Sequence, residues 1–134
     1  MDATCACGAV SLVLEGEPLA QVYCHCDDCQ HAYGAVYVPR AIFPREAVSI
    51  RKGDTRSWVN RSRSMVICAR CGSHLYGEHE SSPLRGVNAA LFPAGASHPS
   101  AHLHCRFAVA PVADDLPRYA DFPSEFGGTG SMVG

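Results

Sequence analysis

The sequence predicts a small, mainly β domain whose antiparallel strands are cross-linked by clustered cysteines. Two observations favour this fold class. Short runs of alternating or β-branched apolar residues recur along the chain between glycines and prolines, whereas helical periodicity is weak. The 134 residues also contain eight cysteines, seven of them in three tight groups. A chain of this length fits one domain with a modest core, to which such cross-links add much stability.

The strand signals follow one another from the start of the chain to about residue 107. The candidate strands are residues 10–14, 19–23, 35–38, 48–51, 55–59, 64–68, 75–77, 86–91 and 103–107. Pro39 is expected to close the third run. Residues 48–51 and 55–59 flank Gly53, which predicts a hairpin with a glycine turn. Only residues 27–33 are expected to form a short helical turn.

The end of the chain has a different composition. From Pro111 we expect a loop that packs Leu116, Tyr119 and Phe122 back on the body. Residues 127–134 are glycine-rich and are expected to be disordered. We therefore predict a single zinc-binding domain over residues 1–126 and a disordered tail over residues 127–134, the zinc being inferred from the cysteines as follows.

The cysteine spacing predicts metal ligands. The motifs are Cys5-Ala6-Cys7, Cys24-His25-Cys26-Asp27-Asp28-Cys29 and Cys68-Ala69-Arg70-Cys71. A Cys-x-Cys disulfide would close a small, strained ring, which disfavours disulfides. Residues i and i+2 of a strand share a face, and Cys-x-x-Cys followed by glycine forms a zinc knuckle. We therefore expect two Zn²⁺ ions per chain.

The seven ligands divide into two sets with different roles. Two chelating pairs make one closed, structural site, the four-cysteine group: Cys5, Cys7, Cys68 and Cys71. One segment supplies three thiolates and leaves a position open, as in catalytic zinc sites; this is the three-cysteine group: Cys24, Cys26 and Cys29. Alternatively, a fourth protein ligand closes the second site, and the candidates are Cys105, His31 and His104.

The histidines give weaker signals. His31 follows the three-cysteine group by two residues, and we predict it as the catalytic proton carrier. His25 lies between two ligands on a strand, so its side chain should face away from their metal. His102 and His104 would share one face of a strand, which we expect to be exposed.

Charge and hydropathy limit the partners. No apolar run approaches the roughly 20 residues of a membrane span, and the start lacks the layout of a signal peptide. We expect a cytoplasmic protein with reduced thiols. The formal net charge is −2, and seven thiolates on two dications would make it more negative, which argues against nucleic-acid binding. Basic residues concentrate between Arg40 and Arg63, as either a solvated face or a patch for an acidic ligand or polyanion.

The three ordered cysteine motifs and the late segment Ala110–Tyr119 resemble the glutathione-dependent formaldehyde-activating enzyme (GFA) family, which includes centromere protein V. The resemblance spans about residues 3–123. It implies a mainly β, Mss4-like fold built around zinc. It also implies that the four-cysteine group holds a structural zinc and the three-cysteine group a catalytic one. The implied activity makes and breaks the bond between formaldehyde and a thiol such as glutathione.

The sequence is therefore compatible with two functions from different classes. The first is a zinc-dependent carbon–sulfur lyase acting on a small thiol or a thiol–aldehyde adduct of the S-hydroxymethylglutathione type. Its open zinc would stabilise a substrate thiolate and polarise an aldehyde oxygen. The second is a non-enzymatic, zinc-stapled binding module that uses both metals for folding. The occupant of the fourth position at the three-cysteine group distinguishes the two.

Overall fold

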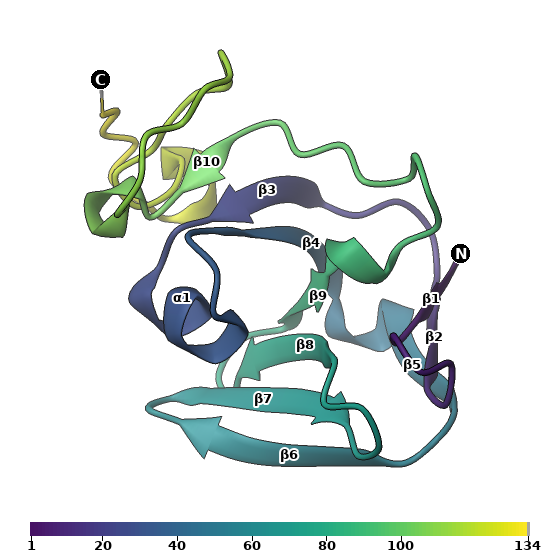
Figure 1. Cartoon of the computed structure of the whole chain (residues 1–134). Coiled ribbons are helices and arrows are strands. Elements are labelled where there is room, and N and C mark those ends of the chain that lie inside the picture. The colour runs from purple at the N-terminus through teal and green to yellow at the C-terminus, as the bar shows by residue number, and fades with distance from the viewer. Residues whose placement is uncertain (134) are drawn as a thin grey trace.

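Residues 1–133, described by a computed structural model, form two β-sheets (Figure 1). The smaller sheet is antiparallel, and its strands β1, β2 and β5 lie in that order at Asp2–Thr4, Ser11–Leu14 and Val48–Lys52. The larger sheet has the order β10-β3-β4-β9-β8-β7-β6. Its strands are, in that order, His102–Leu103, Ala20–Cys24, Val38–Pro44, Leu84–Asn88, His74–His79, Arg63–Cys68 and Thr55–Asn60. Apart from the parallel β10–β3 pair, its neighbours are antiparallel, which confirms the predicted mainly β class.

One α-helix, α1, spans Asp27–Tyr33, as the sequence predicted. It begins at Cys26, whose sulfur accepts a hydrogen bond from the Cys29 N–H, and ends at Gly34 with a φ of 63°. Short 3₁₀ turns are η1 Arg45–Ala47, η2 Ala89–Leu91, η3 Cys105–Phe107 and η4 Ser124–Phe126. Within residues 1–133, no helix has the length and apolar character that crossing a bilayer requires.

The predicted hairpin of residues 48–59 is wrong. β5 pairs with β2 in the small sheet, whereas β6 pairs with β7 in the large one. Pairing with β2 buries Val48 in the main core beside Leu12 and Leu14. Gly53 is still required between the two strands, because its φ is 98° and a Cβ there would collide with the carbonyl oxygen of Ala9. The local turn signal was correct, but long-range packing selects the partner strands.

The run expected to end at Pro39 instead opens β4 and continues to Pro44. Pro39 is opposite Tyr23, whose N–H donates to Ala101 on the other side of β3. On the β9 side, the last pair of the ladder is Arg40 with Asn88, so Pro39 lies beyond it. The missing N–H of Pro39 therefore interrupts no ladder hydrogen bond.

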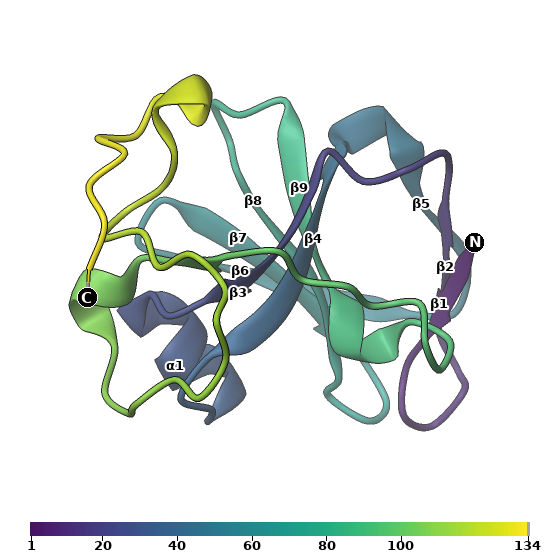
Figure 2. The same ribbon diagram turned by 90° about the horizontal axis from the view of Figure 1, so that it is seen from above.

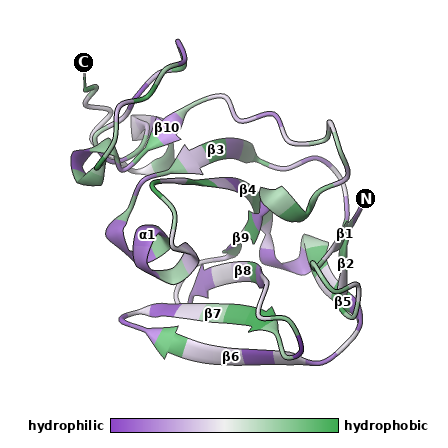
Figure 3. Ribbon diagram, in the orientation of Figure 1, coloured by the Kyte–Doolittle hydropathy of each residue, from purple (hydrophilic) through white to green (hydrophobic). Residues whose placement is uncertain are grey.

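Two apolar clusters fill the interior. The main core contains Leu12, Phe43, Leu75 and Val87 and includes two members of the four-cysteine group. The three-cysteine group lies in a separate, smaller cluster with Val38 and Tyr33. The hydropathy of β7 changes from hydrophilic at its Arg63 end to hydrophobic at its Cys68 end, which belongs to the main core (Figure 3).

The C-terminal segment folds back along the β10 edge of the large sheet (Figure 2). His102 pairs with Arg118, and Tyr119 pairs with Met132. In this tail, the Ser131 carbonyl accepts from the Ala120 N–H and the Val133 N–H donates to the Arg118 carbonyl. A glycine-rich composition does not predict these backbone hydrogen bonds. The disorder expected for residues 127–134 stays a prediction. Gly134 lies outside the described residues.

Candidate metal centres

The four-cysteine group joins the two sheets. Cys5 and Cys7 follow β1 of the small sheet, Cys68 ends β7 of the large sheet, and Cys71 lies in the turn after β7. The sulfur atoms of the group all lie within 4.8 Å of one another, with 3.6 Å between Cys5 and Cys7 and 3.8 Å between Cys7 and Cys68. Tetrahedral zinc with Zn–S bonds of about 2.3 Å places sulfurs roughly 3.8 Å apart. The group therefore fits a zinc ion.

The Cys5–Cys7 pair converges by a turn rather than by the expected strand alternation. β1 ends at Thr4, and the Gly8 N–H donates to the Cys5 carbonyl. The Val10 N–H donates to the Cys5 sulfur at 3.3 Å. A turn with inward N–H groups suits a thiolate better than a strand, because strand N–H groups are used by the ladder.

The three-cysteine group is built by the junction of β3 and α1. Cys24 ends β3, Cys26 is the residue before the helix, and Cys29 lies in its first turn. The sulfurs of Cys24 and Cys29 are 3.6 Å apart, and all three side chains are buried. Gln30 fixes the junction by donating to the carbonyl oxygens of His25 and Phe107 at 2.7 and 2.8 Å.

No fourth cysteine, histidine, aspartate or glutamate of residues 1–133 joins the three-cysteine group. Cys105, His31 and His104, the candidate fourth ligands, all lie outside it. His31, predicted as the proton carrier, is exposed and its Nδ1 lies 2.7 Å from the carbonyl oxygen of Asp27. Two helical positions separate His31 from Cys29, a rotation of about 200° about the axis. The structure therefore does not bring His31 to the sulfurs.

Two arginines border the three-cysteine group. From the sequence alone, both were assigned only to a basic stretch. Arg40 is 5% exposed, so a solvated face is the wrong interpretation for it. Its Nη1 lies 3.5 Å from the sulfur of Cys29, and its Nη2 donates to Gly86 at 2.7 Å. Arg63 brings its Nη1 to 3.8 Å from Cys29 and 4.0 Å from Cys26. A buried guanidinium needs a compensating anion, which the thiolates supply.

The charge balance of the three sulfurs favours a bound dication. Contacts with Cys24 and Cys26, together with the charges of Arg40 and Arg63, lower the pKa of Cys29 to about 2 although burial opposes them. Contacts with Cys26 and Cys29 raise the pKa of Cys24 well above its usual value. One thiol thus ionises at the expense of another. Zinc allows all three to ionise, and soft thiolate donors suit it.

Gly86 makes room for the Arg40 guanidinium, which leads to a first prediction. A Cβ at Gly86 would collide with Nη2 of Arg40, whereas one at Gly77 would meet the same atom at an ordinary 3.4 Å. We expect Gly86→Ala to reduce the free energy of unfolding by about 1–3 kcal/mol through overpacking. The variant should also retain less zinc at the three-cysteine group. Chemical denaturation and zinc analysis should show a smaller change for Gly77→Ala; equal effects would contradict this role.

A buried hydrogen-bonded chain begins beside the three-cysteine group. Nε2 of His25 lies 2.9 Å from Nδ1 of His102, whose Nε2 lies 2.9 Å from Oδ2 of Asp114. Because the carboxylate accepts, His102 donates through Nε2 and accepts from His25 through Nδ1. The remaining Nδ1 of His25 is buried and has no hydrogen-bond partner within residues 1–133.

The expectation of an exposed face at positions 102 and 104 is wrong for His102, which is 0% exposed. Its ring stacks on Tyr23 at a centroid distance of 5.0 Å and meets Tyr37 edge-on. His104 is half-buried, with a φ of 56°. Burial lowers the pKa of His104, although the nearby Cys26 charge opposes this effect. The C-terminal segment, whose position the strand pattern could not predict, covers both histidines.

A polar cavity of 680 Å³ adjoins Arg63. Its lining includes Arg61 and His79 as well as the carboxylates of Glu78 and Glu80. Nη2 of Arg63 lies 3.4 Å from Nε2 of His79. Arg61 forms ion pairs of 3.1 Å with both Asp27 and Asp28. The charge of Arg61 is therefore already compensated by α1, whereas Arg63 faces the sulfurs.

The chain resembles known proteins over most of its length. A sequence model of the family described as "Glutathione-dependent formaldehyde-activating enzyme" matches residues 1–107. A curated Fusarium vanettenii protein, whose name assigns it provisionally to that activity, is 26% identical over 88 residues. The match covers 63% of this chain and 47% of that protein, so the chain spans about half the length of this relative.

The fold is also found in a solved structure. A Rhodobacter sphaeroides protein superposes with a TM-score of 0.55 and 23% identity, covering 70% of this chain and 89% of that one. Together with the two cysteine groups, the family match over residues 1–107 confirms the resemblance inferred from the sequence. The chain belongs to the glutathione-dependent formaldehyde-activating enzyme family.

Proposed function

We propose that this chain is a zinc-dependent carbon–sulfur lyase that acts on adducts between a thiol and an aldehyde. The observation that carries the proposal is the buried three-cysteine group, which no fourth cysteine, histidine, aspartate or glutamate of residues 1–133 completes. Two guanidinium groups border it. Membership of the family supports the same chemistry. We assign a structural zinc to the four-cysteine group and a reducing compartment, such as the cytoplasm, to the protein.

The reaction needs no oxidant or reductant. In the direction of dissociation, the carbon–sulfur bond of the adduct breaks and its electron pair stays on sulfur. The hydroxyl proton of the adduct is released as the carbon–oxygen bond becomes a carbonyl. Thiolate and proton together give the free thiol, and the other product is the aldehyde. Zinc held by the three sulfurs would stabilise the thiolate at its fourth position.

Arg40 and Arg63 determine the net charge around the three-cysteine group, where the substrate would bind. Three thiolates and one Zn²⁺ carry one net negative charge, which the buried guanidinium of Arg40 balances. Arg63 then adds a positive charge beside the sulfurs. The surroundings thus favour an anion, such as the leaving thiolate or a carboxylate of the thiol compound. A purely structural site would need no such excess of positive charge.

Arg63 and Arg61 provide the test. The protein should accelerate the exchange between glutathione and formaldehyde, measured by NMR at equilibrium. Arg63→Ala should raise the KM for glutathione roughly tenfold, because a charged hydrogen bond contributes about 1.5–3 kcal/mol. Arg61→Ala should change KM less than twofold, since two carboxylates of α1 already occupy that guanidinium.

The activity of the wild-type protein tests the proposed function. The comparison of Arg63→Ala with Arg61→Ala tests whether Arg63 binds the thiol compound. No acceleration by a protein shown to hold two zinc ions would favour the non-enzymatic binding module. Acceleration with equal KM values for both variants would keep the lyase but remove Arg63 from thiol recognition. Circular dichroism spectra should establish that both variants are folded.

A further inference from the structure

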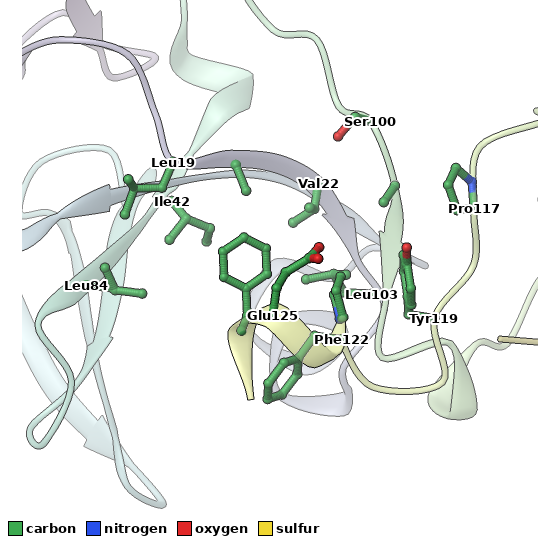
Figure 4. A pocket seen from close by; sticks show the side chains of 14 residues that line it. Leu19, Val22, Ile42, Leu84, Ser100, Leu103, Pro117, Tyr119, Phe122 and Glu125 are labelled. Carbon is green, nitrogen blue, oxygen red and sulfur yellow. The ribbon is translucent and has the colours of Figure 1, made fainter. Parts of the chain in front are cut away.

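An apolar cavity of 450 Å³ lies between the large sheet and the C-terminal segment (Figure 4). Val22, Ile42 and Leu103 line it from the sheet, and Phe122 and Phe126 line it from the opposite side. At its rim, Leu19 and Phe126 are 55% and 56% exposed. Cavities of this size and composition bind small apolar groups.

The cavity lies over the same face of the large sheet as Cys24 of the three-cysteine group. Side chains alternate along β3, so Val22 and Cys24 point to the same face about 7 Å apart. Leu103, which lines the cavity, is the direct neighbour of Cys24 across the β10–β3 pair. Neighbours in register share a face. An adduct with its sulfur at the three-cysteine group could therefore extend a substituent into the cavity.

A second contact connects the cavity wall with the cysteines. The ring of Phe122 lies edge-on to His104 at a centroid distance of 5.7 Å. The residue before His104 is Leu103, whose carbonyl oxygen accepts from the N–H of His25, between two of the three cysteines. The C-terminal segment thus borders both the cavity and the surroundings of the three-cysteine group.

Charges near the sulfurs and in the apolar cavity favour different ends of a substrate. Arg63 lies within 4.0 Å of the sulfurs of Cys26 and Cys29, where its charge favours an acidic thiol compound. Glu125 reaches into the apolar cavity (Figure 4) and disfavours carboxylates there. The apolar cavity therefore suits the hydrocarbon part of the aldehyde.

The geometry points to a preference for adducts of larger apolar aldehydes, whose hydrocarbon group occupies this cavity, over adducts of formaldehyde. This inference rests on the proposed lyase function and specifies its substrate class. The family match ends at residue 107, and the wall that includes Phe122, Glu125 and Phe126 comes after it. Substrate size would thus be set by a segment outside the matched region.

Two series of ligands test the preference. In the first, kcat/KM is measured for glutathione adducts of formaldehyde, butanal and hexanal, and should rise two- to fourfold per buried methylene. In the second, calorimetry compares the unreactive thioethers S-methylglutathione and S-hexylglutathione, of which the hexyl compound should bind at least 30-fold more tightly. Phe126→Ala should reduce both ratios at least fivefold. Val109→Ala, an exposed apolar change outside the cavity, should leave them as in the wild type.

The outcomes separate the two proposals. If no adduct reacts, the lyase function fails. If the formaldehyde adduct reacts and both ratios are flat, the lyase stands and the preference for apolar aldehydes is overturned. If the ratios are large but Phe126→Ala and Val109→Ala give equal values, the hydrocarbon group binds elsewhere and the assignment of this cavity is wrong.

Discussion

Replacing Cys68 with serine should leave the protein without a cooperative unfolding transition. The four-cysteine group joins the turn after β1 to the end of β7, and hence the small sheet to the large one. Structural zinc contributes on the order of 10 kcal/mol to folding, which is comparable with the whole stability of a domain. Thermal melting followed by circular dichroism, with zinc analysis of the same sample, measures the effect.

Cys105→Ser is the matched control for this change. Cys105 is also buried, but it lies outside both cysteine groups. The same sulfur-to-oxygen replacement should there lower the melting temperature by a few degrees and leave two zinc ions bound. Similar melting curves for the two variants would show that the four-cysteine group does not hold the sheets together.

Replacing Cys26 with serine should remove one zinc ion and reduce the proposed lyase activity at least 100-fold while the fold persists. The Cys26 sulfur is one of only three in its group. It also accepts the Cys29 N–H at the start of α1, a position at which serine is a preferred cap. Serine therefore removes the soft ligand and keeps the local helix geometry. Zinc content, melting temperature and the glutathione–formaldehyde exchange rate should be measured together.

Cys26→Ala separates the two roles of this side chain. It removes both the ligand and the cap, so it should be about 1 kcal/mol less stable than Cys26→Ser at the same zinc content. If Cys26→Ser loses both zinc ions together with the fold, the division into structural and catalytic sites is wrong. The non-enzymatic module would then be the better account of the chain.

The grouping of the cysteines was predictable because chelation fixes spacing within a few residues. The sulfurs of Cys7 and Cys68 lie 61 positions apart in the sequence, yet each belongs to a short pair that needs a second pair. The short helix was predictable for a related reason. Its start and end are set by Cys26 and Gly34, which are local signals.

The arginine contacts were not predictable from the same signals, because an arginine in a basic stretch resembles a surface residue. Arg40 can be buried because Gly86, on the neighbouring strand β9, leaves space for its guanidinium. Glycines inside strands could have indicated the close approach of another group. The partner of β5 and the position of His102 depend on packing between distant segments, which periodicity does not report.

β7 carries a ligand of one cysteine group at its end and a charge for the other at its beginning. Cys68 and Arg63 are five residues apart on this strand, a span of about 17 Å. Any change that shifts the strand, for example at buried Val66, would move the guanidinium relative to the sulfurs of Cys26 and Cys29. In an assay such a change would register as weakened affinity for the proposed thiol substrate, although Val66 belongs to the main core. Selection for thiol affinity would thus also act on residues whose only contacts are with the scaffold.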